Sequence, residues 1–158
     1  MAAFSIRAAV PGDEHALFAL VRALARFERL EDGVRGDAQA LGQHLFGGDP
    51  TVGGRPVVEA LLAEEEGAAI GFALFFTNYS TFLTRPGIYL EDLFVLESHR
   101  RQGVGSALLA AVRQIAEARG AGRLEWTVLD WNAGAIDFYR RFGADVLPDW
   151  RLCRVRLR

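Results

Sequence analysis

The spacing of hydrophobic residues in the first half of the chain predicts one strand, two helices and then a group of strands. Apolar residues alternate with polar or small ones over 4–8, which is typical of a strand. Leucine, valine and phenylalanine recur at helical spacing from Leu17 to Phe27, and a second, shorter helix is expected after Asp37, which is placed to cap it. Gly/Pro-rich residues 47–56 indicate a loop. Apolar runs rich in strand formers then predict three strands, at 57–63, 69–76 and 88–95.

The second half alternates between helix and strand patterns. Residues 64–67 join two of the preceding strands as a hairpin turn, and residues 78–87 are expected to form a loop because Pro86-Gly87 breaks a regular element. An amphipathic helix follows, closed by Gly120 and Gly122. A strand, a short helix and a final strand complete the pattern. The four elements expected after the loop are a helix at 103–119, a strand at 124–129, a helix at 133–142 and a strand at 146–158.

This order of elements predicts a mixed α/β sheet with helices on both faces. Three consecutive strands form an antiparallel meander, and a helix then crosses to a further strand, with the right-handed sense that such crossovers take. The chain has 158 residues and shows no internal repeat or linker, so we expect a single domain over 1–158.

Composition narrows the class of protein. Hydrophobic residues make up 51% and charged residues 24%, which is typical of a globular protein rather than a disordered one. The single cysteine, Cys153, excludes an intrachain disulfide and a multi-cysteine zinc site, and the three histidines lack ligand spacing, so no metal is expected. A formal net charge of −2 without a basic stripe argues against a nucleic acid partner. The chain lacks a long apolar run and a signal-peptide pattern, so we expect no membrane contact and a cytoplasmic location.

A glycine-containing loop is the strongest local signal for chemistry. Arg100-Arg101-Gln102-Gly103-Val104-Gly105-Ser106 lies between an expected strand and the long helix. The glycines allow close approach of the backbone to a ligand, and the start of the helix favours an anion such as pyrophosphate. The alternative is an ordinary strand–helix turn. The nicotinamide-binding fingerprint fits less well because Leu108 occupies its third glycine position, and no Gly-Lys-Ser/Thr follows for a P-loop.

Two neighbouring carboxylates, Glu91 and Asp92, lie within an expected strand. Side chains of adjacent strand residues point to opposite faces, so at least one of the two faces a surface that helices cover. Because burying an unpaired carboxylate is costly, each must have a partner, face a wet cleft or take part in chemistry.

The segment from Leu129 to Tyr139 carries the third signal. Asn132 is suited to cap the short helix, and Tyr139 lies seven residues, or about two turns, further on the same side. A tyrosine at the edge of the core is the alternative interpretation.

Taken together, these motifs resemble the GCN5-related N-acetyltransferase (GNAT) superfamily. Arg100-x-x-Gly103-x-Gly105 after a strand, followed by Asn132 and by Phe138-Tyr139-x-x-x-Gly143-Ala144, carries the resemblance. Leu24-Ala25-Arg26-Phe27-Glu28, Tyr89 to Val95 and Asp130-Trp131-Asn132 resemble the diamine and thialysine N-acetyltransferase branch. The match runs from Phe4 to Trp150.

The resemblance implies the acyl-CoA N-acyltransferase fold, with a central, mostly antiparallel sheet, and acetyl transfer from acetyl-CoA to a primary amine by direct attack. It implies Glu91 as base through water and Tyr139 as general acid near the sulfur. It also implies a homodimer. The residues expected to bind the coenzyme are Leu93, Phe94, Val95, Arg100, Arg101, Gln102, Gly103, Val104, Gly105, Ser106, Asn132, Ala135 and Tyr139. Those expected to bind the amine are Phe27, Glu28, Glu91, Glu125, Trp126 and Asp149.

Amine chemistry needs groups of these types. An alkyl amine with a pKa of about 10.4 is almost entirely protonated at pH 7, so exposing its lone pair costs about 4.6 kcal/mol. A carboxylate that accepts the proton meets that need, and a tyrosine hydroxyl can protonate the leaving thiolate. The chain has Ser80-Thr81-Phe82 where polyamine acetyltransferases tend to carry an acidic residue. The missing carboxylate weakens the case for a long polyamine and makes a shorter amine, such as thialysine, a lysine-like compound or a small diamine, at least as good a candidate. A protein or peptide acetyltransferase and a non-catalytic acetyl-CoA sensor are the alternatives.

Overall fold

The computed structural model describes residues 3–158, which contain five strands and four α-helices. The chain divides into two compact units, Met1–Trp126 and Thr127–Arg158, and the single domain expected over 1–158 stays a prediction. The strands are β1 (Phe4–Ala8), β2 (Glu59–Glu65), β3 (Ala68–Ser80), β4 (Arg85–Val95) and β5 (Leu124–Glu125). The helices are α1 (Glu14–Glu28), α2 (Ala38–Phe46), α3 (Val104–Ala118) and α4 (Ala133–Phe142).

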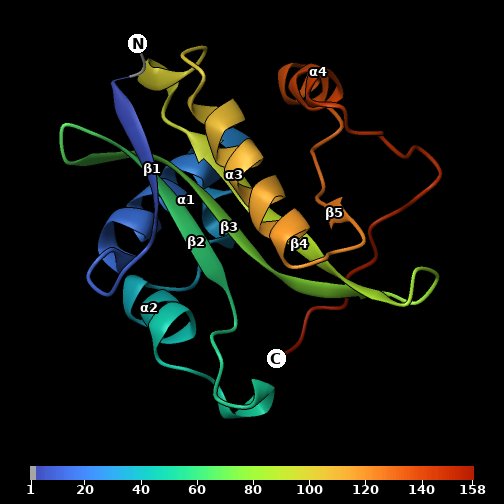
Figure 1. The fold of residues 1–158 in the computed structure, drawn as a ribbon. Coiled ribbons are helices and arrows are strands. Elements are labelled where there is room, and N and C mark those ends of the chain that lie inside the picture. Colours follow the sequence, from blue (N-terminus) through green and yellow to red (C-terminus); the bar gives the residue numbers. More distant parts are fainter. Residues whose placement is uncertain (1–2) are drawn as a thin grey trace. The chain divides into compact units, whose positions relative to one another are not determined.

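The five strands form one sheet in the order β1-β2-β3-β4-β5 (Figure 1). Neighbours are antiparallel except β4 and β5, which run parallel. α3 makes the connection between these two parallel strands. The predicted mixed sheet, mostly antiparallel, is therefore confirmed.

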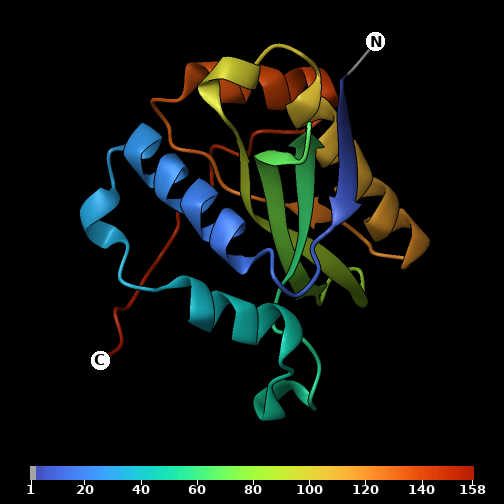
Figure 2. The same ribbon diagram turned by 90° about the vertical axis from the view of Figure 1, so that its left-hand side faces the viewer.

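Helices cover both faces of this sheet, as the sequence predicts (Figure 2). On one face Leu17, Leu20 and Leu24 of α1 join Leu45 of α2 in a hydrophobic cluster with strand residues that include Phe72, Leu74 and Phe94. On the opposite face α3 contributes Leu108, Leu109 and Val112, all fully buried. Burying large aliphatic side chains of this kind stabilises the fold by about 1.5–3 kcal/mol each.

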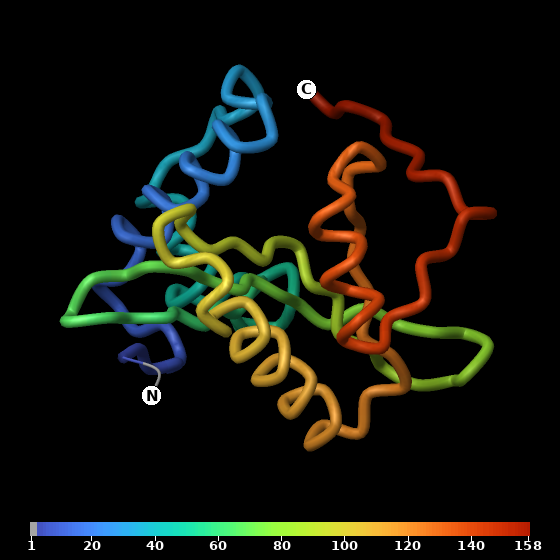
Figure 3. The backbone as a smooth tube through the Cα atoms, turned by 90° about the horizontal axis from the view of Figure 1, so that it is seen from above, coloured from blue at the N-terminus to red at the C-terminus, as the bar shows by residue number. Residues whose placement is uncertain are grey.

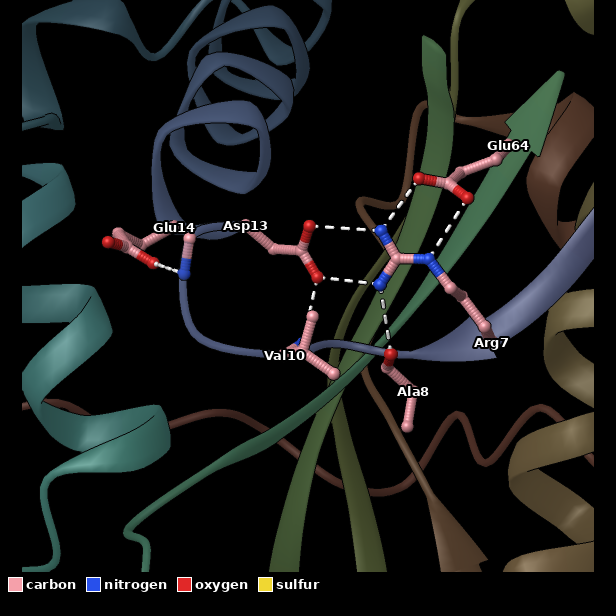
Figure 4. A network of polar contacts seen from close by, with 7 residues as sticks. Arg7, Ala8, Val10, Asp13, Glu14 and Glu64 are labelled. Atoms are coloured by element: carbon pink, nitrogen blue, oxygen red, sulfur yellow. Dashed lines mark hydrogen bonds and ion pairs between the residues drawn. The ribbon is translucent and has the colours of Figure 1, made fainter. Parts of the chain in front are cut away.

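Local signals place the ends of α1 and α2. The Asp37 side chain accepts a hydrogen bond from the Ala40 N–H, so the predicted cap of α2 is confirmed. At the start of α1, Asp13 accepts two hydrogen bonds from the Arg7 guanidinium of β1, and Glu64 of β2 accepts two more (Figure 4). One arginine of β1 thus joins β1 and β2 to the beginning of α1.

The hairpin between β3 and β4 is longer than the sequence indicates. Residues 78–87 were expected to form a loop, but β3 continues to Ser80 and β4 begins at Arg85, so the hairpin extends past the other strands (Figure 1). The Ser80 hydroxyl closes the short turn by accepting a hydrogen bond from the Leu83 N–H. Pro86 does not break β4, because it is the second residue of that strand. It pairs with Tyr79 of β3, and β5 pairs only with the later residues Ile88 and Tyr89.

Two predicted strands are corrected. The strand expected at 124–129 is reduced to Leu124–Glu125, and the strand expected at 146–158 does not form. Residues 144–158 follow α4 as an extended segment without helix or strand (Figure 3). Alternation of apolar residues with arginine is the pattern of a strand with one apolar and one charged face. A strand also needs a neighbouring strand to pair its backbone hydrogen-bonding groups, and none is present for this segment within residues 3–158.

Candidate active site

The loop from Arg101 to Ser106 has the backbone of an anion site. Arg101 has φ 60° and Gly103 has φ 85°, so both lie in the left-handed region. Gly103 is the N-cap of α3, and no side chain among residues 3–158 caps this helix. The N–H groups of the first turn therefore lack intrahelical partners and are available to a ligand, with the positive end of the helix dipole behind them. This arrangement fits a pyrophosphate.

Arg100 points away from that loop. Its guanidinium lies over the Phe27 ring, 4.3 Å from the centroid, and 5.4 Å from the centroid of Phe94. Its Nε donates a hydrogen bond to the Val95 carbonyl at 2.9 Å. Phe94 belongs to the face that α1 covers, whereas α3 covers the opposite face. The Arg100 side chain lies on the side of α1, and the coenzyme contact expected of this residue stays a prediction.

A bulge in β4 separates the two neighbouring carboxylates. Leu74 pairs with Asp92 and the next residue, Phe75, pairs with Leu90, which leaves Glu91 as an extra residue. Glu91 is exposed, whereas Asp92 shares the α1 face with Phe94. The sequence correctly predicts that one of the two carboxylates faces a helix-covered surface. It does not predict the bulge, because alternation alone does not show an extra residue.

Asp92 is the site residue that the sequence analysis did not assign. Burial raises the pKa of its carboxyl, the charges of Glu91 and Glu28 act in the same direction, and together they bring it to about 7. Burial also raises the pKa of Glu28, the last residue of α1. Asp92 accepts no hydrogen bond from any residue of 3–158 that offsets its burial. The adjacent acids in the sequence were the signal for this site, but only the register shows which one is buried.

The far edge of β4 is open beside these acids. β5 pairs with Ile88 and Tyr89 only, so from Leu90 to Val95 this edge has no strand neighbour within the described chain. The expected coenzyme contacts Leu93, Phe94 and Val95 lie along this edge. Main-chain groups on an open edge are free to bind an extended ligand.

The expected amine-binding residues fall into two groups. Phe27 and Glu28 lie at the end of α1, and the Phe27 and Phe94 rings are 6.4 Å apart. Glu125 of β5 instead forms an ion pair with Arg123 at 2.8 Å and accepts a hydrogen bond from Asn78. Trp126 follows Glu125 directly. Of this set, Phe27 and Glu28 share a face with Asp92, while Glu125 already has partners.

The unit from Thr127 contains the remaining expected residues. The Asn132 side chain caps α4 by accepting a hydrogen bond from the Ala135 N–H at 3.2 Å, as predicted. Tyr139 is the buried residue of α4, and its ring lies 5.3 Å from that of Phe138. Asp149 is exposed in the segment after α4. The contact expected between Tyr139 and a bound thioester stays a prediction.

A hollow of about 670 Å³ lies elsewhere, between β1 and α3. Alanine and isoleucine side chains line most of it, and it contains none of the acids described above. Within residues 3–158 no cluster of three or more His, Cys, Asp or Glu side chains is arranged to hold a metal ion. None of the helices in that part of the chain combines the length and apolar character needed to cross a membrane.

Comparison with known families identifies the chain. The model of the acetyltransferase (GNAT) family matches residues 27–144, which contain the bulge, the open edge, the glycine loop and α4. The chain belongs to the GNAT family. The resemblance predicted from the sequence is therefore confirmed, and so is its fold.

The relatives of this GNAT protein include N-acetyltransferases that act on amino acids with a second amine. A thialysine N-epsilon-acetyltransferase of Bos taurus is 38% identical over 94% of this chain and 88% of its own length. An L-ornithine N5-acetyltransferase of Arabidopsis thaliana is 53% identical, over 54% of this chain and 37% of its own length. The chain thus spans little more than a third of that plant protein. With the family match, these relatives make the chain an acetyl-CoA-dependent N-acetyltransferase.

Solved structures agree on the fold. An aminoglycoside acetyltransferase from an uncultured soil metagenomic sample superposes with a TM-score of 0.80 at 19% identity. The match covers 98% of this chain and 97% of that one. The two proteins therefore have the same sheet and covering helices although their sequences are only 19% identical.

Proposed function

We propose that this GNAT enzyme acetylates the primary amine of a small cationic molecule, such as a diamine, a polyamine or a thialysine-like compound. The observation that carries the proposal is the pair of acids on the α1 face. Glu28 raises the pKa of Asp92, so the two carboxyls lie close enough to interact. A bound ammonium group would relieve that repulsion, and paired acids select a cationic acceptor over a neutral one.

Acetyl-CoA would bind along the open edge of β4 and at the start of α3. The main chain of Leu93 to Val95 would hydrogen-bond the pantetheine arm and the acetyl carbonyl. The N–H groups of residues 101–106 would hold the pyrophosphate, as at other helix N-termini. Strand N–H groups aimed at the carbonyl oxygen also stabilise the negative charge that develops there during attack.

The acetyl transfer forms a C–N bond and breaks a C–S bond. The amine nitrogen attacks the thioester carbon, the C–S bond breaks, and the acetyl group remains on the nitrogen as an amide. Glu91, exposed at the bulge, would take the proton released by the ammonium group through water. Tyr139 would give a proton to the leaving thiolate, and the second proton that the nitrogen loses on becoming an amide would restore the Tyr139 hydroxyl. Asn132 and Ala135 would line the coenzyme arm beside it.

We also infer a homodimer, supported by the segment after α4. Val155 and Leu157 are 84% and 91% exposed, and they alternate with Arg154, Arg156 and Arg158. In this segment apolar residues alternate with charged ones, and no strand within residues 3–158 pairs with it. Pairing with a second copy would supply the neighbour. Sedimentation of the full chain and of a chain ending at Trp150 tests this: the full chain should be a dimer and the shortened chain a monomer.

Release of CoA thiol from acetyl-CoA tests the function, with spermidine, putrescine, thialysine, ornithine, an aminoglycoside and a peptide as acceptors. Saturable turnover of a small amine is expected. Turnover of the peptide alone would support the protein acetyltransferase instead. Tight coenzyme binding without turnover of any acceptor would support a sensor.

The variant Tyr139→Phe tests the general acid. It should lower kcat about 10²- to 10⁴-fold and leave the KM for acetyl-CoA nearly unchanged. Tyr79→Phe removes the same hydroxyl from an exposed tyrosine of the hairpin and should have no effect. Unchanged turnover in Tyr139→Phe would remove this residue from the mechanism.

A further inference from the structure

A half-buried guanidinium shares a face of the sheet with the proposed amine site. Asp92 and Phe94 are two residues apart on the α1 face of β4, a separation of about 7 Å along the strand. Arg100 lies over Phe94 and Phe27, and Phe27 is next to Glu28. This face thus has carboxyls at one end and a guanidinium at the other.

The Arg100 guanidinium has N–H donors that make no hydrogen bond within residues 3–158. Arginine carries five N–H donors, and Arg100 uses its Nε on the Val95 carbonyl. Within residues 3–158 no carboxylate pairs with Arg100, whereas Arg7 and Arg119 each bind one or two. The Nη donors of Arg100 form the fork that binds a carboxylate in two-point fashion.

We propose that Arg100 binds the carboxylate of the acceptor, so that the preferred substrate is an α,ω-diamino acid rather than a simple diamine or a polyamine. The inference rests on the proposed function, because it assigns the acceptor of that same site. The terminal ammonium group lies at Glu28 and Asp92, and the α-carboxylate lies at Arg100. The chain of methylene groups between them packs on the Phe27 and Phe94 rings.

Charge explains the preference against polyamines. A polyamine that put its first ammonium group at the acids would bring a second one toward Arg100, where like charges repel. The hairpin segment Ser80-Thr81-Phe82 supplies no carboxylate to compensate. A carboxylate at the same place forms a charge-assisted hydrogen bond instead.

Arg100 could alternatively serve the coenzyme, because it belongs to the Arg-x-x-Gly-x-Gly motif. The position of its side chain argues against this, since the guanidinium stacks on the face opposite α3, whose first turn provides the anion site. The two roles make different predictions for the KM of acetyl-CoA.

Two matched pairs of acceptors test the inference. Ornithine and putrescine differ only by the carboxylate, and so do lysine and cadaverine. The wild-type enzyme should favour the member with the carboxylate about tenfold to 100-fold in kcat/KM. In Arg100→Gln that preference should fall to about one, while the KM for acetyl-CoA stays unchanged. Arg100→Lys keeps a charge but not the fork, so part of the preference should remain.

Because the preference is a ratio measured on one enzyme preparation, a loss of folded protein cancels out. Arg113→Gln removes an exposed arginine of α3 that pairs only with Glu117, and it should keep the full preference. Equal kcat/KM values for ornithine and putrescine in the wild type would overturn the inference, as would a raised KM for acetyl-CoA in Arg100→Gln with the preference intact. Both results leave the proposed function standing. Absence of thiol release with every amine would overturn the proposed function, and this inference with it.

Discussion

Asp92 of β4 pairs across the sheet with Leu74, and this register turns its carboxyl toward the face that α1 covers. The carboxyl is buried near two other acids, so the fold holds it where its charged form is unfavourable. Groups held in this way are common at functional sites and rare elsewhere, because they reduce stability.

Asp92 should make the protein less stable as the pH rises. The folded chain keeps the Asp92 proton up to about pH 7, whereas the unfolded chain releases it near 3.8. Between these values the folded state binds more protons, so the free energy of unfolding falls with rising pH. Asp92→Asn removes the charge and should raise the free energy of unfolding by up to about 4 kcal/mol at pH 8, with little change at pH 4. Urea unfolding at both pH values measures this, and the exposed Asp145→Asn serves as control. An equal effect at both pH values would contradict the assignment.

Glu91 and Asp92 should affect turnover differently. Glu91→Gln removes the proposed proton acceptor and should lower kcat about 10²- to 10⁴-fold at pH 7. Asp92→Asn removes part of the amine site and should act mainly by raising the KM for the amine. Steady-state kinetics on both variants distinguishes the two roles. The opposite pattern, with kcat lost only in Asp92→Asn, would make Asp92 the base.

Gly103 should be required for its backbone conformation, because there is room for a side chain at this position. A Cβ at this position meets no atom within 4 Å, but φ is +85°, which side chains disfavour by about 1–2 kcal/mol. Gly103→Ala should therefore disturb the loop at the start of α3 and raise the KM for acetyl-CoA about tenfold. Gly36→Ala is a matched control, because that glycine is equally uncrowded but has no positive φ. A normal coenzyme KM in Gly103→Ala would place the pyrophosphate elsewhere.

Arg7 should stabilise the fold above acidic pH. The guanidinium lowers the pKa of Asp13 and of Glu64, so the favourable contribution is present at neutral pH and is lost as the pH falls through those lowered values. Arg7→Gln should lower the melting temperature by about 2–6 °C at pH 7 and by less at pH 3. Differential scanning calorimetry at both pH values tests this. Arg113→Gln breaks one exposed ion pair and should shift the melting temperature by less than 2 °C.

Sequence pattern predicted most elements because their signals are local. Asp37 caps α2 and Asn132 caps α4 as expected, since a cap depends on residues within one turn. Features that depend on a distant neighbour were not predictable. Residues 126–129 and 146–158 have strand patterns without a strand beside them, and Glu125 is paired with Arg123 rather than free.

The site shows the same division between local and distant information. Phe27, Glu28 and Glu91 were recognisable from motifs, and the structure places the first two on the same face of the sheet as Asp92. The role of Asp92 depends on which β3 residue it faces, and the position of Arg100 depends on rings from α1 and β4. Neither contact can be predicted from the sequence, because the partners are far apart along the chain.

The extra residue in β4 has a consequence for how this chain tolerates insertions and deletions. Removing Glu91 alone would leave Leu90 opposite Phe75 and Asp92 opposite Leu74, so every buried side chain would keep its face of the sheet. Removing Leu90 or Asp92 would also close the bulge, but Glu91 would then take the place of the removed residue opposite Phe75 or Leu74. Position 91 is therefore the place where β4 can lose a residue while Leu90 and Asp92 both keep their positions, and the residue lost there is the proposed base.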